Sequence, residues 1–192
     1  MVNPNTPSHI MTDSNLHQLL LERHSIRRYT DQQISADNVK TILEAALLAP
    51  SSKSKRPWQF VIVDERPVLA ALAECKDFGG KPIAKAAMAV AVVADPLESD
   101  CWLEDSSIAA IFMHLQAAAL GIGSCWIQVM KRDKGEESAE DIVRSILDIP
   151  ESLKIPCIMT FGYQDETRKP VDPDKLLWEK IHIGKWRHDN QQ

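Results

Sequence analysis

Long apolar runs are missing from this sequence of 192 residues. The longest, such as MAVAVVA at residues 88–94, is far shorter than the roughly 20 apolar residues that a membrane-spanning helix needs. The first dozen residues are polar and contain proline, without the apolar core of a secretory signal. We therefore expect no membrane association and predict a cytoplasmic protein.

Spacings typical of metal and nucleotide sites are also missing. The six histidines form neither HxxxH nor HExxH, and no GxGxxG or GxxxxGK[ST] loop is present. The four cysteines are widely spaced and form no CxxC pair, which excludes a zinc knuckle and disfavours a disulfide framework in a chain of this size. We predict no metal site.

The composition indicates one ordinary globular domain. Hydrophobic residues make up 44% and charged residues 26%, and the formal net charge is −5, which disfavours nucleic acid as the main partner. We expect a flexible arm over residues 1–13 and a single domain over residues 14–192.

Helical and strand patterns alternate along this domain. Ser35 is a suitable N-cap for the second helix, and Ile108, Phe112, Leu115 and Ala119 are expected to form the buried face of the longest one. Glu104 and Asp105 fall in the first turn of that helix, where the helix dipole stabilises carboxylates. Helices are predicted at residues 15–22, 36–49, 68–75, 103–121 and 139–149, with a short one in 174–186, and strands at 58–65, 88–94, 125–129 and 154–163.

The stretch GIGSCWIQV, residues 121–129, resembles the surroundings of a papain-like cysteine nucleophile. Too few residues follow Cys125 for the histidine that such proteases carry about 130–150 residues downstream. His182 could pair with Cys125 in another fold, but nothing marks an oxyanion hole, so we expect a buried, unreactive thiol. Gly121 and Gly123 fit either a plain helix-ending turn or backbone that approaches a ligand closely.

Cations and hydroxyls gather in three separate segments. In RHSIRRYT, residues 23–30, an extended chain would place Arg23, Ser25 and Arg27 on one side, as an anion site or as a solvated basic turn. The loop APSSKSKRPW, residues 49–58, mixes serines with lysines and an arginine. HIGKW near the C-terminus adds His182 and Lys185.

These stretches, in this order and together with AVAVVAD and FGYQDETRKP, resemble the nitroreductase family of FMN-dependent oxidoreductases over most of the chain. The resemblance implies an α+β fold with a central, mostly antiparallel sheet flanked by helices. It also implies an intertwined homodimer with FMN at the subunit interface. Residues at the family's FMN-contacting positions are Arg23, His24, Ser25, Arg27, Pro50, Ser51, Ser52, Ser54, Gly123, Ser124 and Lys185.

The family further implies hydride transfer from NADH or NADPH to FMN and then, in a ping-pong scheme, to a nitroaromatic, quinone or related small acceptor. The cofactor would carry the chemistry, with no catalytic side chain of the protein, and Arg27 would stabilise the reduced flavin. The alternative is an FMN-binding store or redox sensor with little turnover. Ser54 and Arg56 depart from the Asn and Gln that many members carry in the loop, and Arg56 adds a cation that favours an anionic substrate.

Overall fold

The structure, a computed structural model, describes residues 14–186. These residues divide into two compact units: Arg23–Arg168 form the larger one, and the described residues before and after it belong to the smaller one. The predicted arm at residues 1–13 lies outside the described residues, and the single domain over residues 14–192 stays a prediction.

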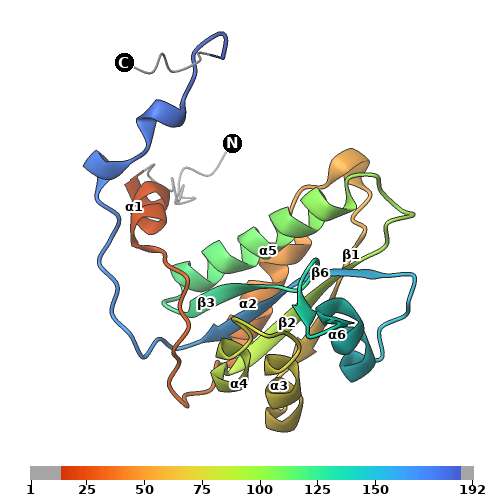
Figure 1. Cartoon of the computed structure of the whole chain (residues 1–192). Coiled ribbons are helices and arrows are strands. Elements are labelled where there is room, and N and C mark those ends of the chain that lie inside the picture. Colours follow the sequence, from red (N-terminus) through yellow and green to blue (C-terminus); the bar gives the residue numbers. More distant parts are fainter. Residues whose placement is uncertain (1–13, 187–192) are drawn as a thin grey trace, which may run out of the picture. The chain divides into compact units, whose positions relative to one another are not determined.

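A four-stranded sheet forms the centre of the larger unit (Figure 1). Its order is β1 (Trp58–Val63), β2 (Met88–Ala94), β6 (Lys154–Gly162) and β3 (Gly123–Gln128), and every neighbouring pair is antiparallel. Helices flank this sheet, so the predicted α+β class with a mostly antiparallel sheet is confirmed.

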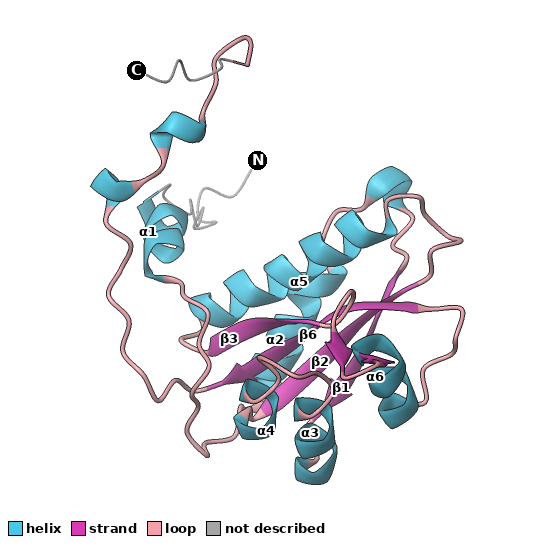
Figure 2. Cartoon of the chain, in the orientation of Figure 1, coloured by secondary structure: helices cyan, strands magenta, loops and turns pink. Residues whose placement is uncertain are grey.

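Both faces of the sheet are covered by helices (Figure 2). Helices α2 (Ala36–Leu47) and α5 (Trp102–Ala119) cover one face, and α3 (Arg66–Ala73), α4 (Pro82–Lys85) and α6 (Ala139–Leu147) cover the other. Strand β2 shows the consequence, because Val90 and Val92 pack toward α2 and α5 while Ala89 and Ala91 pack toward α3 and α6. A strand buried on both sides has no polar face, which explains the uninterrupted apolar run of β2.

The buried face of α5 differs from the predicted one. Small and polar side chains face the core, namely Asp105, Ser106, Ala109, Ala110, Met113, His114 and Ala117. The predicted face lies on the opposite side of the helix, where Ile108 and Phe112 are each 37% exposed. The alanines let α5 pack closely on the sheet and on α2, and the larger apolar residues lie on the outer face of the helix.

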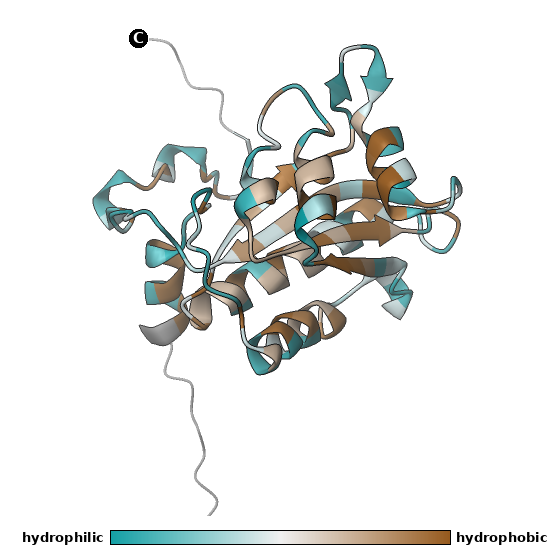
Figure 3. Ribbon diagram, turned by 90° about the horizontal axis from the view of Figure 1, so that it is seen from below, coloured by the Kyte–Doolittle hydropathy of each residue, from teal (hydrophilic) through white to brown (hydrophobic). Residues whose placement is uncertain are grey.

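The shorter elements complete the described chain. The strands β4 (Asp133–Lys134) and β5 (Glu137–Ser138) form a small hairpin that the sequence pattern did not indicate. This hairpin is hydrophilic, whereas the strands of the main sheet are largely hydrophobic (Figure 3). The smaller unit contains α1 (Ser14–Glu22), and the amide of Val171 donates to the carbonyl of Leu21 at 2.8 Å. Where one short C-terminal helix was predicted, the chain forms the 3-10 turns Pro173–Lys175 and Trp178–Lys180.

Candidate functional site

Residues 23–30, called the arginine segment below, run extended along the edge of the sheet. Ser25 forms a parallel bridge with Ser124 on β3, and the amide of Ile26 donates to the carbonyl of Ser124 at 2.9 Å. Ile26 and Tyr29 are buried, and the Tyr29 hydroxyl bonds to Thr160 Oγ1 at 2.8 Å on β6. The segment therefore lies along the edge of the sheet, with Ile26 and Tyr29 turned inward and the two arginines between them exposed.

Two glycines make room for the inward side chains. A Cβ at Gly123 would lie 2.9 Å from Ile26, and a Cβ at Gly162 would lie 2.8 Å from the ring of Tyr29. Gly121 has a φ of 71° and forms the turn that ends α5. These glycines are thus required by the helix end and by packing of the arginine segment on the sheet.

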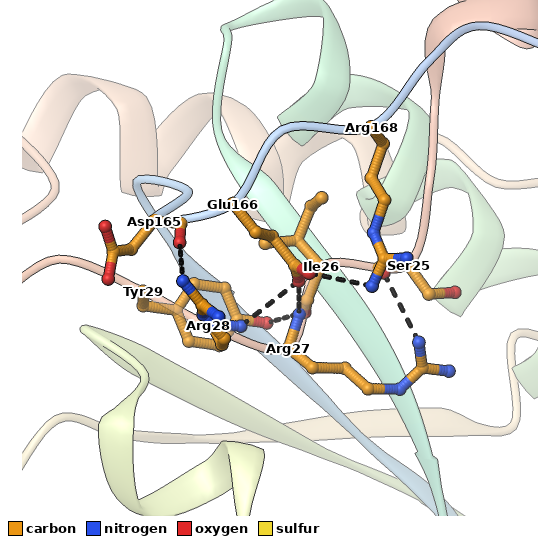
Figure 4. Close-up of polar contacts among 8 residues, drawn as sticks. All are labelled: Ser25, Ile26, Arg27, Arg28, Tyr29, Asp165, Glu166 and Arg168. Atoms are coloured by element: carbon orange, nitrogen blue, oxygen red, sulfur yellow. Dashed lines mark hydrogen bonds and ion pairs between the residues drawn. The ribbon is translucent and has the colours of Figure 1, made fainter.

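The carboxylate of Glu166 fastens the arginine segment from outside the sheet (Figure 4). It accepts hydrogen bonds from the backbone N–H of Arg27 at 2.7 Å and of Arg28 at 3.3 Å, and it pairs with Arg168 at 2.7 Å. These donors, first among them the Arg27 amide, hold the pKa of Glu166 below its ordinary value. Glu166 is therefore an ionised anchor for the backbone of the segment.

The side chains of Arg27 and Arg28 point to opposite sides of this anchor (Figure 4). Arg28 Nη2 donates to the carbonyl of Asp165 at 2.9 Å. Arg27 Nη1 reaches only the carbonyl of Ser25, at 3.5 Å, and within residues 14–186 Arg27 forms no ion pair with a carboxylate. The positive charge of Arg27 is therefore not neutralised by an ion pair within the described residues.

Arg23 also has a neutral partner. Its Nη1 lies 2.7 Å from Nε2 of His114 on α5, and Nδ1 of His114 contacts Oγ of Ser124. His114 is 5% exposed and Ser124 is 2% exposed. Burial, reinforced by the charge of Arg23, lowers the pKa of His114 to about 4, so the imidazole is neutral at neutral pH.

Cys125 is unsuited to nucleophilic catalysis. The residue is 1% exposed, and its Sγ lies 3.5 Å from the carbonyl of Trp126. Burial raises the pKa of the Cys125 thiol above its ordinary value, whereas a nucleophilic cysteine needs a lowered one. The geometry agrees with the expected buried, unreactive thiol.

Residues 51–56, called the serine loop below, adopt a conformation that is uncommon for residues with side chains. Lys53, Ser54 and Arg56 have φ values of 50°, 54° and 51°, in the left-handed region that favours glycine. The Ser51 side chain accepts a hydrogen bond from the amide of Arg56 at 3.0 Å, so the loop is partly closed by its own bonds. The backbone of this loop is therefore strained and held in place.

Asp105 in the first turn of α5 fastens the serine loop. One carboxylate oxygen accepts the amide of Ser52 at 2.8 Å, and the other accepts the hydroxyl of Ser99 at 3.2 Å. Asp105 is 2% exposed, so both bonds are shielded from water. The dipole interpretation of Asp105 is therefore incomplete, because its carboxylate is directed at a loop that carries predicted contacts.

Helix α5 holds the two groups of predicted contacts at separate places. Asp105 and His114 are nine positions apart, which at about 1.5 Å and 100° per residue separates them by roughly 14 Å and half a turn. Lys185 belongs to the smaller unit. The sequence analysis gave His114 and Glu166 no role and interpreted Asp105 only through the helix dipole. The two residues on α5 could have been noticed as polar residues on a face rich in alanine.

One buried polar atom of the arginine segment has no partner. His24 Nε2 is buried and forms no hydrogen bond within the described part of the chain. Unpaired buried polar atoms are uncommon and can mark a place that a ligand or a second subunit completes. Among residues 14–186, no group of three or more potential metal ligands occurs, and no helix is long and apolar enough to cross a membrane.

Comparison with known proteins now places the chain in a family. The model of the nitroreductase family matches residues 20–96 and 76–163. The chain belongs to the nitroreductase family. The matched region contains the arginine segment, the serine loop, α5 and β3, so the predicted family is confirmed.

Individual nitroreductase relatives resemble the chain over most of its length. An FMN-dependent nitroreductase from Clostridium difficile R20291 is 39% identical, with a TM-score of 0.87 over 88% of this chain and 99% of that one. A protein of Archaeoglobus fulgidus, provisionally named NADH dehydrogenase/NAD(P)H nitroreductase, is 36% identical over 88% of this chain and 97% of its own length. An NADH dehydrogenase of Thermus thermophilus is 26% identical over 87% of this chain and 93% of its own.

Proposed function

We propose that this chain is an FMN-dependent oxidoreductase that takes hydride from NADH or NADPH and reduces a small acceptor of the nitroaromatic or quinone class. The names of its relatives support this reaction class, since they describe NAD(P)H nitroreductases and an FMN-dependent nitroreductase. The observation that carries the proposal is that the guanidinium groups of Arg23 and Arg27 have only neutral hydrogen-bond partners among the described residues, so their charges remain available to an anionic cofactor.

The residues present fit FMN. Arg23 and Ser25 would hold the phosphate and ribityl chain, since a guanidinium and a hydroxyl are good donors to such groups. Arg27 would lie against the pyrimidine edge of the ring. The buried, unpaired Nε2 of His24 leaves a further polar atom for the cofactor or a second subunit.

FMN, when bound, supplies the hydride acceptance from NAD(P)H and the subsequent transfer to the acceptor. The chain binds and orients it, and Arg27 stabilises negative charge where it develops on the ring. Neutral partners preserve the field of both arginines, because a carboxylate at either position would cancel much of it. The other residues proposed to contact FMN are Pro50, Ser51, Ser52, Ser54, Gly123, Ser124 and Lys185.

The proposed assembly is a homodimer with FMN at the subunit interface. The outer face of α5 exposes apolar side chains in the single chain, including Ile108 at 37%, Ile111 at 45% and Phe112 at 37%. The serine loop and the arginine segment are fastened at different places on α5, which suits sites that combine the loop of one subunit with the segment of the other. Ile111→Glu is expected to lower the mass measured by light scattering from dimer to monomer, whereas Leu97→Glu, a change at an 89% exposed residue, should not.

The reaction is tested by anaerobic titration of the flavin-loaded protein with NADH and NADPH. Rapid bleaching of the flavin absorbance, followed by recovery on addition of a quinone, is expected for the enzyme. A flavin that neither reductant bleaches would overturn the enzymatic proposal and favour the alternative, an FMN store or redox sensor.

Arg23→Ala tests the placement of the cofactor. The variant should be isolated largely without flavin, while the matched variant Arg28→Ala, whose guanidinium binds the carbonyl of Asp165, should retain it. Full flavin occupancy in Arg23→Ala would show that the phosphate is bound elsewhere.

A further inference from the structure

His114 connects two parts of the proposed cofactor site that come from different regions of the chain. The residue lies in the third quarter of α5 and is 5% exposed. On one side it contacts Arg23 of the arginine segment, and on the other it contacts Ser124 of β3.

The partners of His114 determine its protonation state. A guanidinium can only donate, so Nε2 must accept the hydrogen bond from Arg23 Nη1 across 2.7 Å. The ring proton is therefore on Nδ1 and is donated to Ser124 Oγ. The lowered pKa of His114, caused by burial and by Arg23, agrees with this neutral tautomer.

A neutral acceptor affects Arg23 differently from a carboxylate. The imidazole fixes the direction of the guanidinium through one N–H, while the full positive charge and the remaining N–H groups stay available. The bond from Nδ1 to Ser124 fixes the ring, and the amide of Ile26 donates to the Ser124 carbonyl at 2.9 Å. Arg23 is thus oriented relative to β3 through a continuous set of hydrogen bonds.

We propose that His114 is a positioning residue that orients the Arg23 guanidinium toward the phosphate of FMN, and so determines how strongly the protein prefers FMN over riboflavin. The inference rests on the proposed function, because it assumes FMN at the arginine segment. His114 acts through Arg23 and does not itself touch the cofactor.

The experiment compares FMN and riboflavin, which differ only in the phosphate. Flavin-free protein is titrated with each, and quenching of flavin fluorescence gives the dissociation constants. His114→Leu is expected to weaken FMN binding by about tenfold or more, as loss of a charge-assisted hydrogen bond implies, while riboflavin binding changes by less than about threefold. A merely structural role would weaken both ligands alike, and that result would overturn the proposal.

Two polar variants provide the matched comparison if leucine prevents folding. The side chain of His114→Gln can reach the position of Nε2 and accept from Arg23, whereas that of His114→Asn reaches only the position of Nδ1. The glutamine variant should keep most of the preference for FMN, and the asparagine variant should lose it. Equal preferences in the two variants would contradict a role through Arg23.

A double variant tests the route of the effect. If His114 acts through Arg23, then combining His114→Leu with Arg23→Ala should weaken FMN binding no more than Arg23→Ala alone. Additive losses would contradict the proposal. A wild-type protein that binds riboflavin and FMN equally would overturn this inference alone, whereas one that binds neither would overturn the proposed function as well.

Discussion

The arginine segment and the serine loop both carry proposed cofactor contacts, but the chain holds them in different ways. The arginine segment is an extended strand-like stretch that pairs with β3 and is fastened by Tyr29, Glu166 and His114. The serine loop has three left-handed residues and is attached to α5 through the carboxylate of Asp105. The segment is held by isolated bridges and side-chain contacts to several elements, whereas the loop is strained and is held by its own hydrogen bonds and by the buried carboxylate of Asp105.

The difference shows how one helix can serve two functional elements. Asp105 and His114 are at opposite edges of the buried face of α5, about half a turn apart. Each is a polar residue on a buried face that is otherwise formed by three alanines, Ser106 and Met113. The helix thus fixes the loop near its N-terminal end and the segment further along.

The largest expected effect is the loss of stability in acid, where protonation of His114 removes its hydrogen bond from Arg23. The folded-state pKa of His114 is about 4, below its ordinary value of 6.5, so the unfolded chain binds more protons between these values. The contribution of the neutral imidazole to the free energy of unfolding is therefore fully present above pH 6.5. It is lost as the pH falls toward 4, by about 3 kcal/mol in total.

Urea unfolding of the wild type and of His114→Gln between pH 7 and pH 4 measures this loss. Carboxylates such as Glu166 also lose stabilising interactions in acid, but they do so in both proteins. The wild type should therefore lose more stability than the variant. Parallel curves would show that His114 does not titrate as the structure implies.

Removal of the Asp105 carboxylate should have the next largest effect. Asp105→Ala leaves the Ser52 amide and the buried Ser99 hydroxyl without their acceptor, which costs about 2 kcal/mol of unfolding free energy. Asp105→Asn keeps an acceptor and should cost less. Glu104→Ala, an exposed change in the same helical turn, should stay within about 0.5 kcal/mol of the wild type; equal losses for Asp105 and Glu104 would contradict the fastening of the loop.

Loss of Glu166 should lower the free energy of unfolding by less, because the contacts of the arginine segment with β3, β6 and α5 remain. Glu166→Ala removes the acceptor of two backbone amides and one ion pair, and we expect a loss of about 1 kcal/mol in chemical denaturation. Asp165→Ala is the control, since Asp165 contributes its carbonyl rather than its carboxylate to the bonds of Figure 4. A larger loss for Asp165 would contradict the anchor.

The smallest effect should be a gain in stability. Ser54 has a φ of 54°, so Ser54→Gly relieves backbone strain and should stabilise the protein by about 0.5 kcal/mol. Ser52→Gly, in the same loop but without a positive φ, should destabilise it slightly. Thermal unfolding of both variants makes the comparison, and the opposite order of stability would show that the loop is not strained at Ser54.

Periodicity predicted the regular parts of the fold because local pattern determines them. The apolar run of β2 and the Ser35 cap of α2, where the Ser35 side chain accepts from the amide of Asn38 at 3.3 Å, are as expected. The buried face of α5 was predicted wrongly, because hydrophobicity alone favoured Ile108 and Phe112 over the alanines. The outer face of this helix is one whose apolar residues a second subunit would cover.

The fastening of the site could not be predicted in the same way. His114 meets Arg23 across 91 positions of sequence, and Glu166 meets Arg27 across 139. Such contacts depend on the tertiary arrangement, and no local spacing signals them. The segments rich in arginine and serine were visible in the sequence, but the residues that orient them were not.

The most direct test of the proposed cofactor is the visible absorption spectrum of the purified protein, followed by denaturation and identification of the released chromophore. We predict a flavin spectrum and release of about one FMN per chain, as a site that holds a single cofactor implies. A colourless protein that also fails to take up added FMN would contradict the account, and the fold would then be shared with the family without its chemistry.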